Sequence, residues 1–399
     1  MAIDLAALRA HFPSLETGLA FFDGPGGTQT PRPVADAIAA TLTGPLSNRG
    51  TIGPSELNAE RTVADFRAAL ADLLHVPAGG IVHGRSATQL TYDFSRHLAK
   101  GWNAGDEVIL SRLDHDANVR PWVQAAKRAG VTVRWIEIDP ETTELDLDSY
   151  ERALSPRTRL VAVTAASNVL GTKPPVRQIA DRAHEVGALV YVDGVHYAAH
   201  HLVDVPASGA DLFVCSPYKF LGPHCGVLAA APELLETLRP DKLLPSTDTV
   251  PERFEFGTLP YEILAGATAA VEFLAAMDPD RQTSRRERLA RSLSSMHDHE
   301  LTLRTRLQDG LLALGDVITL HSKAPDRTPT LLMTLEGRDA REAHAHLATR
   351  NVVAPAGSFY AYEPFTALKL EDPALRVGLA PYNTAEDVDR LLDGLATFL

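Results

Sequence analysis

The stretches LVYVDGVH (residues 189–196) and LFVCSPYK (residues 212–219) set the architecture of this chain. Each begins with a short apolar run, as in a β-strand that is buried on both faces, and each ends in polar residues. Asp193 closes the first strand, and Lys219 follows the second. Strands of this kind are typical of parallel sheets covered by helices. Ligands of such sheets bind beyond the carboxyl ends of the strands, where both residues lie.

The alternation of strand and helix extends outward from these stretches. A continuous apolar run at 160–165 predicts another buried strand, and 131–138 alternates as a strand does. Apolar residues at helical spacing predict helices at 34–42, 63–74 and 122–129. Strands and helices that alternate with short connections predict an α/β fold with a parallel sheet between helices.

The last third of the chain has a different pattern. Residues 263–277 form a long Ala-rich helical stretch, and 385–399 predict a closing helix. We expect a smaller α+β domain here. The predicted division is a large domain over 18–262 and a small domain formed by 1–17 and 263–399, with the connecting helix in the small domain.

Composition narrows the class of protein. The 399 residues are 45% hydrophobic and 22% charged, as in soluble globular proteins. The net charge of −13 argues against a nucleic-acid partner. No apolar run approaches the roughly 20 residues of a membrane span, and the N-terminus lacks the basic segment of a signal peptide. We therefore expect a cytoplasmic protein with no membrane partner. Two cysteines, Cys215 and Cys225, exclude a disulfide framework and a multi-cysteine zinc site.

Polar residues at the predicted strand ends suggest a ligand. Asp193 needs a partner because an unpaired buried carboxylate is costly, and an N-cap amide, a cation or a metal would serve. Lys219 lies among apolar residues, where desolvation lowers the pKa of a lysine and frees its amine as a nucleophile. The stretch 83–89 (HGRSATQ) leads into a helix, and its small residues suit either a phosphate or a plain cap. Asn168 follows the strand at 160–165 as a turn residue or a ligand-binding one.

These features together fit one coenzyme. A carbonyl coenzyme with a basic ring nitrogen and a phosphate needs a Schiff-base lysine, an acid for the nitrogen and an amide-lined cradle for the phosphate. Lys219, Asp193 and the 83–89 stretch meet these needs. The combination describes pyridoxal 5′-phosphate.

Further motifs extend over nearly the whole chain. They are FFDGPGGT (21–28), DHDAN (114–118), ASNVLG (166–171), VDGVH (192–196), CSPYK (215–219), FEFGT (254–258), Arg376 and YNT (382–384). In their order and spacing the chain resembles the fold type I class V aminotransferases, in the cysteine desulfurase-like branch. The resemblance implies a mostly parallel seven-stranded sheet in the large domain and pyridoxal phosphate as coenzyme. It also implies a homodimer whose active site lies at the subunit interface.

The resemblance implies roles around the coenzyme ring. Lys219 would form the Schiff base (the internal aldimine) and then move protons. Asp193 would pair with the ring nitrogen, and His115 would stack on the ring. Asn168 and His196 would lie near the ring hydroxyl.

Phosphate and substrate contacts are implied in the same way. The phosphate-binding set is Ala87, Thr88 and Ser216, with Gly257 and Thr258 reaching in from a second subunit. Arg376 would bind the substrate carboxylate, as guanidinium geometry permits. Arg49, also from a second subunit, and Gly27 complete the substrate contacts.

The chain departs from the persulfide-forming desulfurases in one loop. Those enzymes carry a nucleophilic cysteine before the carboxylate-binding arginine, but residues 354–362 (APAGSFYAY) contain none. Cys215 and Cys225 fit packed small residues. We therefore expect cleavage of a C–S bond in L-cysteine or a cysteine S-conjugate, through a Lys219 aldimine and a Cα carbanion, without a protein persulfide. The loop at 359–362 (FYAY), with its three aromatic residues, would accommodate a larger substituent on the substrate sulfur.

Three further departures from the family pattern leave two alternative functions open. Tyr218 replaces the usual His before the lysine, His196 replaces a Gln, and Ala87 replaces a Thr of the phosphate loop. An aminotransferase, an epimerase or a decarboxylating deaminase acting on another amino acid is the first alternative. A catalytically inactive binding protein of the same fold is the second. His196, His200 and His201 lack the nearby acid of an H-E-x-x-H zinc motif, so no metal is expected.

The strand-end lysine leads to the first prediction. We expect the purified protein to be yellow, and Lys219→Ala to lose the coenzyme adduct that borohydride traps, because the attaching amine is gone. Absorbance and peptide mass mapping after reduction measure both. An unchanged trapped lysine in the variant would contradict the assignment.

Overall fold

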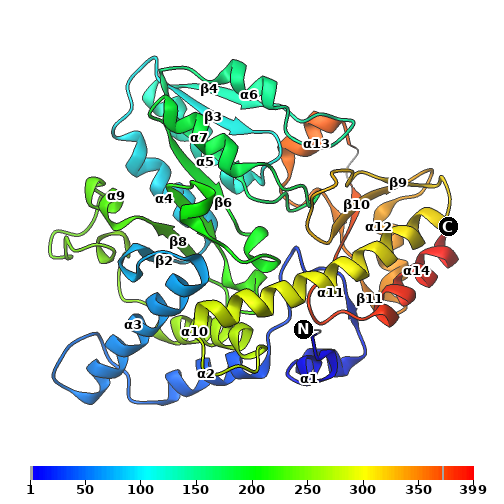
Figure 1. Cartoon of the computed structure of the whole chain (residues 1–399), viewed down its shortest axis with the longest axis horizontal. Helices are drawn as coiled ribbons and strands as arrows, with labels where there is room; N and C mark the ends of the chain where they lie inside the picture. Colours follow the sequence, from blue (N-terminus) through cyan, green and yellow to red (C-terminus); the bar gives the residue numbers. More distant parts are fainter. Residues whose placement is uncertain (1–2, 371–372) are drawn as a thin grey trace.

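The computed structural model describes residues 3–370 and 373–399 and contains a large central sheet (Figure 1). Its seven strands, in spatial order, are β2 (Ile81–Gly84), β8 (Gly226–Ala230), β7 (Leu212–Cys215), β6 (Leu189–Asp193), β5 (Thr158–Thr164), β3 (Glu107–Ser111) and β4 (Thr132–Ile136). The pairs from β7 through β4 are parallel, and β8 is antiparallel to both of its neighbours. The predicted mostly parallel sheet of an α/β fold is confirmed.

Alternating side chains on the strands give the sheet two apolar faces. On β6, Val190 and Val192 belong to one buried cluster and Tyr191 to the other. The first face packs against α3 (Pro54–Leu74), α7 (Val176–Glu185) and α10 (Tyr261–Ala276). The second is covered by α4 (Ala87–Ala99) and α5 (Arg120–Ala129), where Trp122 meets the Tyr191 ring edge-on at 4.9 Å. Burial on both faces explains why these strands are apolar throughout.

Further helices surround this three-layer core. They are α1 (Leu5–Arg9), α2 (Arg32–Thr43), α6 (Leu147–Ala153), α8 (Val205–Ser208), α9 (Pro232–Thr237) and α13 (Tyr362–Leu368). Single 3₁₀ turns lie at η1 (Pro13–Thr17), η2 (Ala78–Gly80), η3 (Asp116–Asn118), η4 (Tyr197–Ala199), η5 (Pro217–Lys219) and η6 (Glu252–Phe254). No helix within 3–370 or 373–399 is long and apolar enough to cross a bilayer.

A second apolar core lies at the C-terminal side. Its sheet has the order β12 (Ala356–Gly357), β13 (Ala374–Gly378), β10 (Thr330–Leu335) and β9 (Ile318–Leu320), all antiparallel. The helices around it are α11 (Arg285–Ala313), α12 (Ala340–Ala348) and α14 (Ala385–Phe398). The short strands β1 (Ala20–Phe21) and β11 (Val352–Val353) pair beside it in parallel.

The long helix α11 joins the two cores (Figure 1). Leu289 and Leu293 near its start pack with the core of the large sheet, whereas Leu303 and Leu307 belong to the second core. Helix α10 also packs with the first core, so the sequence-based division at residue 263 separates it from its packing partners. We propose that the domain boundary lies within α11.

Candidate functional site

The carboxyl ends of the central strands surround a pocket. In the strand register, Asp193 lies beside Thr164 of β5 and Val214 of β7. Eight of the residues singled out from the sequence line this pocket: Ala87, Thr88, His115, Asn168, Asp193, His196, Ser216 and Lys219. The sheet therefore brings together side chains that are up to 132 residues apart in the chain, from Ala87 to Lys219.

Lys219 is held on a short turn that keeps its amine away from water. The turn η5 follows β7 directly, and Pro217 at its start fixes the backbone. The side chain is buried, and Nζ donates a hydrogen bond to the backbone oxygen of Pro25. Burial and, to a smaller extent, the positive charge of Arg376 lower the pKa of Lys219 to about 7, and the negative charge of Asp193 opposes this shift. A large fraction of this amine is therefore neutral near neutral pH.

Asp193 is the acid opposite this amine. It ends β6, and its Oδ1 accepts a hydrogen bond of 2.9 Å from the Val195 backbone N–H. Burial raises the pKa of Asp193 to about 6, against the lowering effects of that N–H and of Lys219. A cationic group placed beside Asp193 would favour its charged form.

His115 lies at the pocket as a neutral imidazole. Its Nδ1 accepts a hydrogen bond of 3.0 Å from the Ala117 N–H, so the ring proton is on Nε2. Burial lowers the pKa of His115 to about 4. The preceding Asp114 is fully buried and accepts hydrogen bonds from the Asn118 side chain (2.7 Å) and the Thr164 N–H (3.1 Å). Asp114 thus fixes the backbone that presents His115.

Two pocket side chains have buried polar atoms that lack a hydrogen-bond partner among the described residues: Asn168 Oδ1 and His196 Nδ1. Both side chains are anchored at their other end. Asn168 Nδ2 donates to the Phe359 backbone oxygen (3.0 Å), and His196 Nε2 lies 2.9 Å from the Thr328 hydroxyl. Because unpaired buried polar atoms are costly, these atoms indicate a polar ligand.

The start of α4 forms an amide-lined cradle. Ser86 caps the helix by accepting a hydrogen bond from the Gln89 N–H at 3.1 Å, which leaves the first two helical N–H groups, those of Ala87 and Thr88, without intrahelical partners. Such helix starts attract phosphate. Gly226 makes the cradle possible, since a Cβ atom there would lie 2.3 Å from the Ser86 carbonyl carbon.

Arg376 enters the site from the second sheet. It lies on β13, is buried, and donates from Nη1 to the Asn168 backbone oxygen at 3.1 Å. Its guanidinium carbon lies 3.9 Å from the centre of the Phe359 ring. Burial lowers the pKa of Arg376 to about 9, and the nearby Asp23 opposes the shift. A buried guanidinium with spare donors is suited to a carboxylate.

Gly27 lies in the segment that covers Lys219. A Cβ atom at Gly27 would lie 3.2 Å from the Tyr218 ring, so a larger residue would crowd the lysine turn. Gly257 and Thr258 are exposed and do not line the pocket of this single chain. Their predicted phosphate contact requires a second subunit and stays a prediction.

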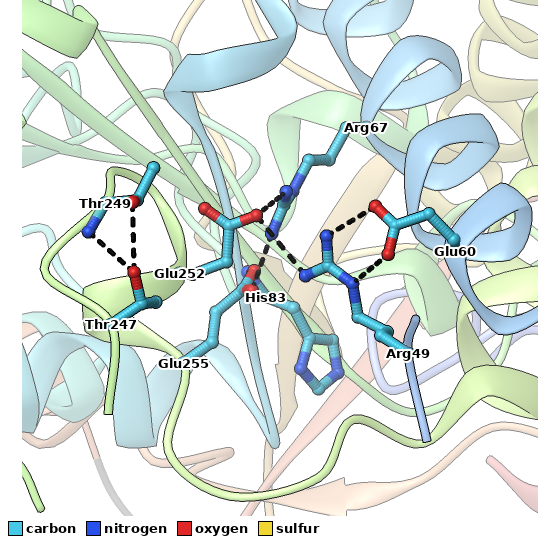
Figure 2. A network of polar contacts seen from close by, with 8 residues as sticks. All are labelled: Arg49, Glu60, Arg67, His83, Thr247, Thr249, Glu252 and Glu255. Carbon is cyan, nitrogen blue, oxygen red and sulfur yellow. Dashed lines mark hydrogen bonds and ion pairs between the residues drawn. The ribbon is translucent and has the colours of Figure 1, made fainter. Parts of the chain in front are cut away.

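Arg49 is held by acids of its own chain (Figure 2). Its guanidinium makes two hydrogen bonds of 2.8 Å to Glu60 and one of 3.3 Å to Glu252. Arg67 pairs with Glu252 (2.6 Å) and with the buried Glu255 (2.7 Å). Substrate binding by Arg49 would compete with these ion pairs, and that role also stays a prediction.

Arg49, Glu60, Arg67, Glu252 and Glu255 form one network of ion pairs, called here the Arg49 network. It reaches the strand that leads into the phosphate cradle and the segment before Gly257. Glu255 accepts a hydrogen bond of 2.9 Å from the His83 N–H on β2, which leads into α4. Glu252 lies in the turn η6, just before Glu255 and Gly257. The network therefore ties the turn η6 to β2, the strand that leads into the cradle.

The sequence-based candidates omit several pocket residues. These are Ser86, Thr91, Ala117, Thr164, Ala166, Val195 and Tyr218. Five of them lie within stretches already named as motifs, and that position alone would have indicated them: Ser86, Ala117, Ala166, Val195 and Tyr218. Thr91 lies one helical turn after Ala87, and its hydroxyl is 3.0 Å from the Tyr191 hydroxyl. No group of three or more potential metal ligands is arranged for metal binding in the part of the chain that the structure describes.

The comparisons with known proteins agree on one family. The model of the class V aminotransferase family matches residues 20–391. An uncharacterized protein of Mycobacterium tuberculosis is 33% identical over 100% of both chains, and a cysteine desulfurase of Klebsiella pneumoniae is 31% identical over 99% of this chain and 98% of its own. The crystal structure of an Escherichia coli cysteine desulfurase has a TM-score of 0.87 at 25% identity, covering 99% of this chain and 98% of that one. Members of this family depend on pyridoxal phosphate.

The lowered pKa of Lys219 leads to the second prediction. Only a neutral amine attacks an aldehyde, so coenzyme attachment to the coenzyme-free protein should speed up as pH rises through about 7 and then level off. Stopped-flow absorbance at several pH values measures the rate. Nα-acetyl-lysine, which keeps a free side-chain amine, is the control for titration of the coenzyme itself. The rate at which this amine reacts with the coenzyme should keep rising to about pH 10. Parallel profiles for protein and control would show that Lys219 has an ordinary pKa.

Proposed function

Because the chain belongs to the class V aminotransferase family, in its cysteine desulfurase-like branch, we propose that it cleaves the C–S bond of L-cysteine or a cysteine S-conjugate with pyridoxal phosphate. The observation that carries the proposal is the buried Lys219 amine opposite Asp193, in a chain whose 354–362 loop has no cysteine. The net reaction is RS–CH₂–CH(NH₃⁺)–COO⁻ + H₂O → RSH + CH₃–CO–COO⁻ + NH₄⁺.

The pocket residues fit the coenzyme. Lys219 offers the attaching amine, and Asp193 offers a charge partner for the ring nitrogen. The first amides of α4 are free for the phosphate, and the unpaired atoms of Asn168 and His196 are free for the ring hydroxyl. When bound, pyridoxal phosphate supplies an acceptor for the electron pair that remains when a bond to Cα breaks.

The residues of the chain would handle the protons and the substrate. Arg376 orients the substrate through its carboxylate. Lys219, with its pKa lowered to about 7, accepts the Cα proton as a general base. The Cβ–S bond then breaks with both electrons on sulfur, and the thiolate takes up a proton to leave as RSH. Asp193 must stay charged beside the ring nitrogen, and loss of one partner of such a buried pair costs about 3–5 kcal/mol.

The two cysteines support release of a free thiol. Both are buried, and burial raises the pKa of Cys225 to about 12 and that of Cys215 well above its ordinary value. A neutral, buried thiol is a poor nucleophile. Neither cysteine is suited to accept sulfur from the substrate as a persulfide.

A second copy of the chain would complete the site. Large apolar side chains are exposed on two segments, 49–60 and 244–258, which the Arg49–Glu252 ion pair joins: Ile52 is 89% exposed, Leu244 97% and Phe256 48%. Exposed apolar residues of this kind mark protein–protein contacts. We propose a cytoplasmic homodimer in which these segments meet and Gly257 and Thr258 approach the partner's phosphate cradle.

The third prediction tests the reaction and its sulfur path. Cysteine and S-methyl-, S-benzyl- and S-aryl-cysteine are incubated with the enzyme, and thiol, keto acid, alanine and racemised amino acid are measured by mass spectrometry. We expect thiol and pyruvate in equal amounts, and the double variant Cys215→Ser/Cys225→Ser should keep this activity. Alanine with a trapped persulfide would establish sulfur transfer through the protein, and complete loss of activity in a folded double variant would revive that route. Racemised amino acid or a keto acid that retains sulfur would favour an epimerase or an aminotransferase. No product and no coenzyme binding would favour an inactive binding protein.

The fourth prediction concerns Arg376. Arg376→Ala should raise KM for carboxylate substrates about 10- to 100-fold, since one charge-assisted, two-point contact is lost. Arg376→Lys should recover only part of the loss because it lacks the planar fork. The S-conjugate of cysteamine, which has no carboxylate, is the control and should show the same KM in all three proteins. Unchanged KM for the amino acid would place the carboxylate site elsewhere.

A further inference from the structure

A groove of about 580 Å³ lies next to the coenzyme pocket, outside the loop that lacks the cysteine. The groove is formed by this loop, the helix α13 and the turn η3. Its lining side chains are mainly aromatic or apolar: Phe359, Tyr360, Tyr362, Phe365 and Leu370, together with Asp116, Ser358 and Thr366. Tyr360 and Tyr362 are 78% and 61% exposed, which is unusual for large aromatic residues beside a functional site.

The loop is held in place on both sides. Phe359 and Tyr360 have φ angles of 54° and 55°, in the left-handed region that bulky residues rarely adopt. Their backbone oxygens accept hydrogen bonds from Asn168 Nδ2 (3.0 Å) and from the Asp116 N–H (2.8 Å). Backbone strain of this kind persists only where the surroundings fix it, and it often marks a binding site. The backbone that carries the Phe359 and Tyr360 rings is therefore fixed in position.

The groove lies next to the coenzyme pocket, and adjacent residues line the two cavities. The Tyr360 ring centre lies 5.6 Å from that of His115, which lines the pocket, and the next residue, Asp116, lines the groove. Asn168 lines the pocket and also holds the Phe359 end of the loop. A substituent too large for the pocket would pass Tyr360 and lie against these rings.

The charges at the groove are already compensated. Asp116 accepts a hydrogen bond of 2.7 Å from Arg120, whose guanidinium carbon lies 5.5 Å from the Tyr362 ring centre. Buried Glu363 at the start of α13 pairs with Arg112 and with Arg120 (3.1 Å). The groove thus offers rings and paired charges, which favour an uncharged apolar group.

We infer that this groove binds the substituent on the substrate sulfur, and that this substituent is aromatic or a bulky apolar group. The inference rests on the proposed function for the identity of the substrate. It assigns Tyr360 and Tyr362 as the residues that determine which S-conjugate the protein prefers.

The test compares a benzyl with a methyl substituent in turnover and in binding. The holoenzyme is assayed for kcat/KM with S-benzyl- and S-methyl-L-cysteine. S-benzyl- and S-methyl-3-mercaptopropionate, which lack the amine and cannot react, are titrated by calorimetry. We expect at least a 10-fold preference for benzyl in both measurements, the size expected of a specific apolar pocket. Tyr360→Ala/Tyr362→Ala should reduce both ratios to about 1 to 2. Ratios are used because Tyr360 also contacts His115.

Leu312→Ala, at an exposed position on α11, is the matched control and should leave both ratios unchanged. A benzyl-to-methyl ratio near 1 in the unaltered protein, or a high ratio that survives the double substitution, overturns the inference. Turnover of both substrates with no benzyl preference would remove the subsite and leave the proposed function intact. A tyrosine-dependent benzyl preference in binding without turnover would keep the subsite and remove the proposed reaction.

Discussion

The chemistry of the site depends on the burial of Lys219 and Asp193 away from water. Both side chains lie at the carboxyl end of the central strands, and burial shifts both pKa values toward the neutral forms. An ordinary surface lysine keeps its proton at neutral pH, whereas this amine is half neutral near pH 7. A cationic partner beside Asp193 would shift this acid back toward its charged form. A coenzyme with a cationic ring nitrogen and an aldehyde satisfies both groups together.

The rest of the molecule supports this pair from two sides. The parallel strands fix where Asp193 and Lys219 end, and the second sheet brings Arg376 and the aromatic loop against them. Glycine is required where the backbone comes close, as at Gly226 beneath the α4 cradle. Chemistry and specificity are therefore built from different segments of the chain. The coenzyme pocket is formed at the strand ends of the large sheet, and the groove is formed by the 354–362 loop and α13, whose apolar residues pack against the same core.

Much of this was predictable from the sequence, for physical reasons. Apolar strands that end in polar residues revealed the sheet and the residues at its carboxyl edge, because burial on both faces leaves a continuous apolar run. The resemblance to class V aminotransferases added the seven strands, and it is also the source of the roles that we propose for residues such as Arg376. The pairing of Arg49 with Glu60 and Glu252 could not be predicted, since ion pairs depend on how distant segments meet. The packing of α10 with the large sheet was missed for the same reason. Its Ala-rich sequence carries no sign of which core it joins.

The structure shows the surroundings of the residues that depart from the desulfurase pattern. The loop that lacks a cysteine carries aromatic rings instead, and hydrogen bonds to the backbone oxygens of Phe359 and Tyr360 hold it next to the pocket. The position usually taken by glutamine is His196, which is anchored by Thr328 and has a free nitrogen inside a buried site. These changes leave the lysine, the acid and the free amides at the start of α4 in place.

A crystal structure of the purified protein, grown with pyridoxal phosphate, would test whether the coenzyme attaches to Lys219 and pairs with Asp193. We expect electron density continuous from Lys219 Nζ to the coenzyme, with an Asp193 oxygen within hydrogen-bond distance of the ring nitrogen and the phosphate at the start of α4. Coenzyme density attached to another residue, or a pocket closed by side chains in crystals that contain the coenzyme, would contradict it.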